Sequence, residues 1–156
     1  MKILGKNGLS GFFEMMVGML MVMGVLVMVT LPWLLDLYFR SYRNMYSGID
    51  AGHLKLMILL YISGVLSLII LIFAKIFLNS VNNGKPFVKQ NVRNMRIIAL
   101  MCALMAVCYA VYVPILFSIF VVFMFLVFCM VTLVVLICAE LFKQAIIFKE
   151  ENELTI

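Results

Sequence analysis

Apolar and charged positions occur in long, separate blocks along this chain. Residues 12–35 carry a single charge, Glu14, and residues 56–74 carry none. Because a helix crosses a hydrocarbon core of about 30 Å with about 20 residues, each block predicts one membrane-spanning helix. A third block, Ile97–Ala139, is also uncharged. As a single helix it would measure about 65 Å, so it must fold back on itself.

Pro114 marks the fold-back point, because it is the only proline of the third block and the residue before a proline is disfavoured in helices. We therefore predict a short turn at Val113–Ser118. The expected fold is all-α, a polytopic four-transmembrane-helix bundle in one domain, residues 1–156. Its predicted parts are spans at about 12–35, 54–78, 96–113 and 118–142, a loop at 79–95 and a C-terminal tail at 143–156.

Composition excludes a soluble globular protein. The chain is 67% hydrophobic and 12% charged, whereas a soluble domain is about 45–50% apolar and about 25% charged. A soluble domain of this size leaves much of its surface in water and could not bury so many apolar side chains. The surplus must face lipid, so the lipid bilayer is the first predicted partner.

Lysine and arginine set the predicted orientation, because loops on the cytoplasmic side carry an excess of both. The chain has 12 such residues, and only Arg40, Arg43 and Lys55 fall between the first two spans. Placing both termini inside leaves the other nine on the cytoplasmic side. We predict a multi-pass protein of the cell membrane with its N- and C-termini in the cytoplasm.

The residue types argue against catalysis and metal chemistry. His53 is the only histidine, and the four cysteines lie in the long apolar block without Cys-x-x-Cys spacing. The sequence has no His-Glu-x-x-His motif, phosphate-binding loop or recognisable Ser/His/Asp set. No charged residue lies in the middle of a span, where ion pumps usually need one. We expect no enzymatic activity, no metal and no cofactor.

A basic stripe precedes the third span, and an acidic tail follows the fourth. Lys89, Arg93 and Arg96 recur at helical spacing, in a helix expected to start near Pro86. The third and fourth helices are joined by a short turn, so they should be antiparallel neighbours. Arg96 and Glu140 should then lie at similar depth, as a candidate ion pair.

Two interpretations of these charges remain open. The stripe either anchors the protein by snorkelling to the headgroups or forms a docking surface. The tail is either a solvated end held by the stripe or a partner-binding peptide; its glutamates should be repelled by anionic lipid. The fourth helix is expected to end near Phe148, with three glutamates beyond it. The candidate partner-binding residues are Lys89, Arg93, Arg96, Glu140, Glu150, Glu151, Glu153, Leu154 and Ile156.

Small residues form a stripe along the third span: Ala99, Ala103, Ala106 and Ala110. Small side chains let helices approach closely in lipid. We expect this stripe to pack against a neighbouring helix rather than to bind a ligand.

Two stretches carry a resemblance to a known family. One is Gly84-Lys85-Pro86-Phe87 followed by Asn91 and Arg96, similar to a Pro-Phe-x-x-x-Asn motif ahead of a third span. The other is Glu140-Leu141-Phe142 with the ending Lys149-Glu150-Glu151-Asn152-Glu153-Leu154-Thr155-Ile156. Together they resemble a family of small bacterial four-helix membrane proteins, catalogued as domain of unknown function, family twenty-nine seventy-five. The resemblance implies pairing with a small helix-turn-helix regulator, because such a regulator is often encoded beside members of the family.

Two functions are the resulting hypotheses. The first is a non-enzymatic regulatory or interaction subunit that uses the basic loop and the acidic tail to bind a cytoplasmic protein, without contacting nucleic acid itself. The alternative is a small transport or immunity component that works as a homo-oligomer, since four short-looped helices leave little room for a pore of their own.

Overall fold

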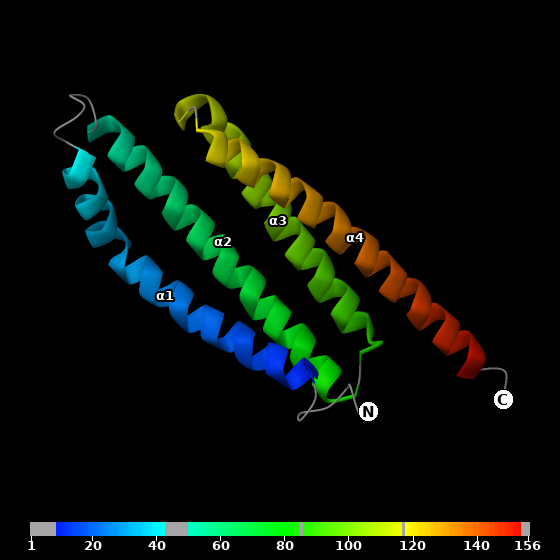
Figure 1. Ribbon diagram of the computed structural model, residues 1–156. Helices are drawn as coiled ribbons and strands as arrows, with labels where there is room; N and C mark the ends of the chain where they lie inside the picture. The colour runs from blue at the N-terminus through cyan, green and yellow to red at the C-terminus, as the bar shows by residue number, and fades with distance from the viewer. Residues whose placement is uncertain (1–8, 43–49, 85, 117, 154–156) are drawn as a thin grey trace.

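The structure, a computed structural model, describes residues 9–42, 50–84, 86–116 and 118–153. These residues form four α-helices (Figure 1): α1 (Leu9–Tyr42), α2 (Asp50–Asn82), α3 (Lys89–Leu116) and α4 (Ile119–Glu153). All four are long and apolar enough to cross a membrane. The prediction of an all-α, four-span membrane protein is therefore confirmed.

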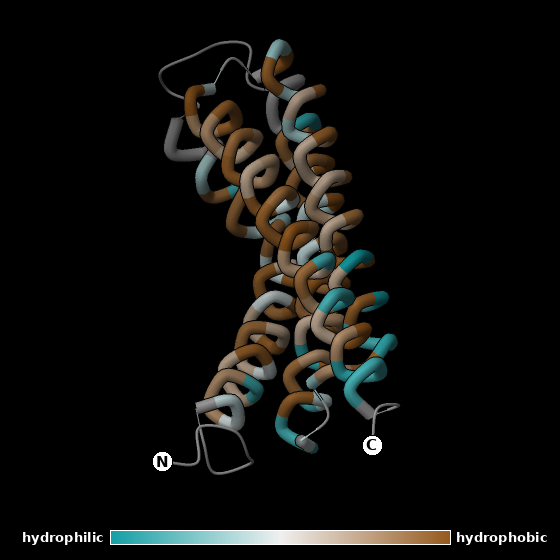
Figure 2. Tube along the Cα trace, turned by 90° about the vertical axis from the view of Figure 1, so that its right-hand side faces the viewer, coloured by the Kyte–Doolittle hydropathy of each residue, from teal (hydrophilic) through white to brown (hydrophobic). Residues whose placement is uncertain are grey.

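The helices run alternately up and down and lie side by side in chain order (Figure 1). Each packs against the next one in the chain, most extensively α3 against α4. Within the described residues, no other pair of helices approaches closely at the backbone. The start of α1, the end of α2, the start of α3 and the end of α4 lie at one end of the array, here called the proximal end. Figure 2 shows hydrophilic residues gathered toward this end, near the C-terminus.

The best-buried apolar cluster joins three of the helices. Leu59 of α2 meets Met105 and Tyr109 of α3 and Val121 of α4, all less than a tenth exposed. The ring of Tyr109 stacks on Phe128 with centroids 5.6 Å apart. Helix α1 takes no part in this cluster and buries mainly two leucines of its own, Leu31 and Leu35. Most of the surface of α1 is apolar and exposed, as a lipid-facing helix requires.

The turn between α3 and α4 is shorter than predicted. Helix α3 continues through Pro114 to Leu116, and α4 already begins at Ile119. A proline inside a membrane helix costs one backbone hydrogen bond, which neighbouring groups can replace. The N–H groups of Val121 and Val122 both donate to the carbonyl of Ser118, at 3.0 and 3.3 Å, and so begin α4 directly after the turn.

The proximal connection between α2 and α3 is also short, because both helices extend into the predicted loop. Residues 83–88 alone separate them, so most of the loop expected at 79–95 is helical. Gly84 has a positive φ of 72°, the left-handed conformation that glycine adopts without steric cost after a helix. Its N–H donates to Val81 at 3.0 Å. The first turn of α3 is closed by the Asn91 N–H, which donates to the Val88 carbonyl, so α3 starts at Lys89 and not near Pro86.

Helix α4 ends five residues later than expected, at Glu153 instead of Phe148. The added residues include lysine and glutamates, which have high helix propensity. The glutamates predicted to hang beyond the helix are therefore held on it. This places Glu150 at a fixed position relative to α3.

The alanine stripe of α3 packs against neighbouring helices over only part of its length. Ala99 and Ala106 are buried, whereas Ala103 is half-buried and Ala110 is exposed. An open apolar groove of about 690 Å³ between α3 and α4 is lined in part by Ala103, Ala106 and Ala110. Within this single chain, the predicted packing therefore holds for Ala99 and Ala106, while Ala110 stays exposed.

Candidate interaction surface

Salt bridges link the proximal ends of α3 and α4. The Lys89 Nζ lies 2.9 Å from Glu150 Oε1, and Arg96 Nη2 lies 3.5 Å from Glu140 Oε2. Lys143 Nζ lies 3.1 Å from the other oxygen of Glu140, one turn along α4. The short distal turn makes the helices antiparallel, so the basic start of α3 faces the acidic end of α4. The predicted Arg96–Glu140 pair is confirmed.

These charges border a groove of about 300 Å³, here called the charged groove. Its apolar base includes Val92 of α3 and Ile146 of α4, each less than a tenth exposed. The remaining lining residues are Lys89, Arg96, Lys143, Ile147 and Glu150. An apolar base with a charged rim is the anatomy of a protein–protein contact site.

The ion pairs of the charged groove position side chains more than they stabilise the fold. Lys89 is 79% exposed and Glu150 53%, and both members of the Arg96–Glu140 pair are about half exposed. Exposed pairs contribute about 0–1 kcal/mol, since water and salt screen them. What they provide is a fixed arrangement of charge on two rigid helices.

The other predicted residues occupy different positions. Arg93 is exposed, does not line the charged groove, and forms no salt bridge with another described residue. Glu151 is exposed on α4, and Glu153 ends that helix. Leu154 and Ile156, like the side chain of Glu153, lie outside the described residues.

Lys143 belongs to the charged groove, although it was not among the predicted site residues. The sequence signal was its spacing of three residues from Glu140, which places both side chains on one helical face. Lys143 contributed only to the predicted orientation, as one of the nine basic residues expected on the cytoplasmic side.

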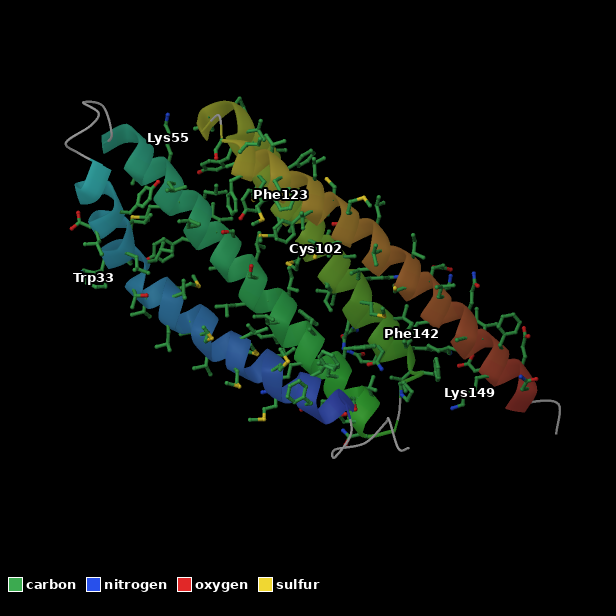
Figure 3. All side chains as sticks on the ribbon, viewed as in Figure 1. Trp33, Lys55, Cys102, Phe123, Phe142 and Lys149 are labelled. Carbon is green, nitrogen blue, oxygen red and sulfur yellow. The ribbon has the colours of Figure 1, made fainter. Side chains whose placement is uncertain are left out.

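An aromatic contact ties the charged groove to the rest of the fold. The ring of Phe142 on α4 lies 5.8 Å from that of Phe77 on α2 and 5.6 Å from that of Phe87 in the α2–α3 connection. Figure 3 labels Phe142 on the proximal half of α4. Phe87 and Phe142 come from the two stretches that carry the family resemblance, so those stretches meet in space.

A buried asparagine fixes the start of α3. The side-chain amide of Asn91 donates to Ser80 Oγ at 3.0 Å and to the Pro86 carbonyl at 2.8 Å, and Asn91 is only 1% exposed. These bonds join α2, the connection and α3. The Pro-Phe-x-x-x-Asn spacing therefore has a local structural role, because the asparagine reaches back to its own proline.

The described residues hold no cluster of three or more His, Cys, Asp or Glu side chains arranged to bind a metal. The cysteines are free thiols, of which Cys102 is buried.

Comparison with known proteins gives one family match. No curated protein and no solved structure matches the chain. The sequence profile of the family described as "Protein of unknown function (DUF2975)" matches residues 15–156, which include most of the first span, the other three spans and both stretches that carry the resemblance. The chain is therefore a multi-pass membrane protein that belongs to the DUF2975 family.

Proposed function

We propose that the protein is a non-enzymatic regulatory or interaction subunit of the cell membrane, and that it binds a cytoplasmic protein at the charged groove. The observation that carries this proposal is the groove itself, in which an apolar base lies between helices whose rim charges are held by exposed ion pairs. Because such pairs add little stability, recognition is the better explanation for them.

The extent of α4 supports the same role. From Glu140 to its last residue, Glu153, α4 continues for about 20 Å. This extension, in which charged residues alternate with apolar ones, is longer than anchoring at the headgroups requires. It presents Lys143, Glu150 and Glu151 to the aqueous side, which we propose is the cytoplasm because of the lysine and arginine distribution.

The proposed partner is a small soluble protein with complementary charges. The family resemblance suggests a helix-turn-helix regulator, which would make the membrane protein a means of holding or releasing that regulator. In this proposal the membrane protein touches the regulator and not nucleic acid.

Charge reversal tests the proposal. Lys89→Glu combined with Arg96→Glu should leave the protein inserted and folded, because it replaces two exposed pairs worth about 0–1 kcal/mol each by exposed, screened like-charge contacts of similar size. It should abolish capture of a soluble partner in a pull-down from detergent-solubilised native membranes. Adding Glu140→Lys and Glu150→Lys restores opposite charges across the groove and should recover part of the capture.

Arg93→Glu is the matched control, since it reverses an exposed arginine of the same helix outside the charged groove. It should capture the partner as the unaltered protein does. If the groove double variant captures normally, or if Arg93→Glu is equally damaging, the groove is not the binding site.

The alternative is a homo-oligomeric component of transport or immunity. The open apolar groove beside Ala103 and Ala110 favours it, because small residues let a helix of a second copy approach closely in lipid. The same pull-down separates the two functions. Recovery of further copies of this chain, without a soluble partner, supports the alternative.

A further inference from the structure

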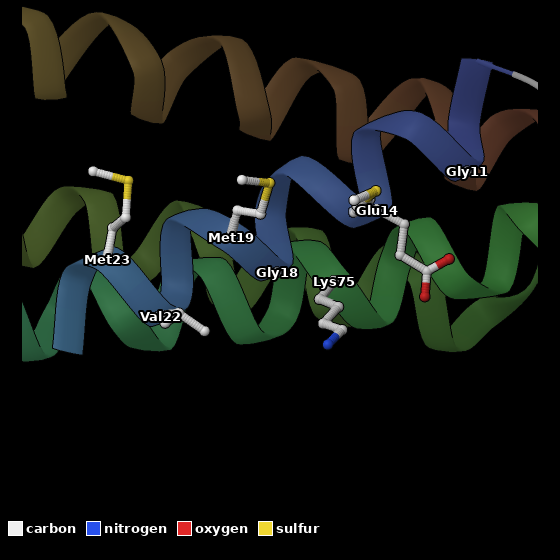
Figure 4. Close-up of a pocket in the computed structure, with 8 residues that line it drawn as sticks. Gly11, Glu14, Gly18, Met19, Val22, Met23 and Lys75 are labelled. Carbon is white, nitrogen blue, oxygen red and sulfur yellow. The ribbon is translucent and has the colours of Figure 1, made fainter. Parts of the chain in front are cut away.

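A third groove lies on the other side of the array, along α1, and α2 contributes one of its lining residues. It has a volume of about 630 Å³, and its walls are mostly methionine, valine and glycine. Two charged side chains interrupt them, Glu14 of α1 and Lys75 of α2 (Figure 4). This groove shares no lining residue with the charged groove, so its occupant is independent of the proposed protein partner.

The carboxylate of Glu14 is held in position by a part-buried polar contact. The side-chain amide of Asn82, which is 8% exposed, donates to Glu14 Oε2. The Asn82 carbonyl oxygen in turn accepts from the Ser10 hydroxyl, and its amide reaches the Ser10 carbonyl at 3.5 Å. Glu14 is therefore preorganised, with its second oxygen not used by this network.

Lys75 is exposed and makes no salt bridge with any described residue. Figure 4 shows its ammonium directed away from the Glu14 carboxylate, so the two charges do not neutralise each other. The groove thus presents one negative and one positive group at separate points.

The two charges lie near the proximal ends of their helices, where headgroups would be within reach. Glu14 is about 8 Å from the start of α1 and Lys75 about 11 Å from the end of α2, at the proximal end of both helices. From there the groove continues toward the membrane centre along Met19, Val22 and Met23. Polar groups at one end and an apolar trough beyond them match the shape of a lipid molecule.

We propose that this groove binds a phospholipid of the ethanolamine type. Its primary ammonium would pair with Glu14, its phosphate with Lys75, and one acyl chain would lie along the methionines, whose flexible side chains adapt to irregular partners. A choline headgroup has no N–H to donate to Glu14. A glycerol headgroup has no cation at all. The charge pair therefore selects ethanolamine over glycerol, and the N–H donated to Glu14 selects it over choline.

Native mass spectrometry of the detergent-purified protein tests this site. The probes are phosphatidylethanolamine, phosphatidylcholine and phosphatidylglycerol with identical acyl chains. We expect phosphatidylethanolamine adducts at about fivefold lower lipid concentration than those of the other two, the effect of one exposed ionic contact. Glu14→Gln should remove the preference over choline and favour the anionic glycerol lipid, because Lys75 remains.

Lys75→Gln should weaken all three lipids by about fivefold. Lys75 is exposed and forms no salt bridge with a described residue, so its replacement should not disturb folding. The Lys75→Gln variant therefore still tests the site if Glu14→Gln fails to fold. The control is Lys55→Gln at the opposite end of α2 (Figure 3), which should change nothing. Equal binding of the three lipids by the unaltered protein would overturn the proposal, as would an ethanolamine preference that survives Glu14→Gln or an equal effect of Lys55→Gln.

Discussion

Asn91 and Asn94 occupy the same face of α3 and are both 1% exposed, yet their amides are in different situations. Asn91 donates to Ser80 and Pro86. The oxygen of Asn94 accepts from Gln90 at 3.2 Å, but its amide nitrogen has no hydrogen-bond partner among the described residues. A buried donor without a partner costs free energy, whereas a satisfied one stabilises the fold.

The pair therefore forms a matched test of buried hydrogen bonding. Asn91→Leu should lower the free energy of unfolding by about 1–3 kcal/mol, because it leaves Ser80 Oγ and the Pro86 carbonyl without the hydrogen bonds that Asn91 donates. Asn94→Leu should change it by less than about 1 kcal/mol, because the lost bond to Gln90 is offset by relief of the unpaired amide. Thermal unfolding in detergent measures both. Equal losses would show that side-chain shape, not hydrogen bonding, matters at these positions.

Helices α1 and α2 fit together through glycines. A Cβ added to Gly64 of α2 would lie 3.1 Å from the sulfur of Met28 and 3.2 Å from its Cγ. A Cβ added to Gly24 of α1 would lie 3.2 Å from a methyl group of Leu68. Both distances are shorter than ordinary van der Waals contacts, so the glycines set how closely the two helices approach.

Gly64→Ala should therefore destabilise the protein relative to Gly18→Ala by about 1 kcal/mol, the lower end of the cost of overpacking. Gly18 is the control because its added Cβ would meet only Lys75 Nζ, at 3.9 Å. Both variants gain the same helix propensity from alanine, so the difference in their unfolding temperatures reports the contact with Met28. No difference would mean that Met28 moves aside freely.

The four helices were predictable because hydrocarbon thickness dictates the length of an apolar block. The faces along which they pack were not, because lipid-facing and helix-facing side chains are equally apolar in this chain. Ala110, for example, continues the alanine stripe but is exposed. The Arg96–Glu140 pair could be predicted, because charges near the membrane surface are few and the antiparallel turn brings them together. The contacts of Glu14 with Asn82 could not, because they depend on how α1 is rotated against α2.

For the molecule as a whole, the placement of basic residues predicts the orientation in the membrane. The proximal end contains the α2–α3 connection and the charged groove, and the lysine and arginine counts predict that it faces the cytoplasm. A fluorescent or enzymatic reporter that works only in the cytoplasm should be active when fused after Ile156 or inserted at Gly84. Inserted at Gly48, it should be silent. Activity at Gly48 would contradict both termini being inside.

Within the described residues, the backbone of α1 comes close to that of only one other helix, α2. Mechanically the helices are thus connected in series, so a force applied to α1 must pass through α2 before it reaches α4. The contact of Phe77 with Phe142 provides one point of transfer at the proximal end. A change in bilayer tension or thickness that tilts α1 would be attenuated by any slip between α1 and α2. The fit of Gly24 and Gly64 against their neighbours, though remote from the charged groove, would then determine how much of the movement of α1 reaches α4.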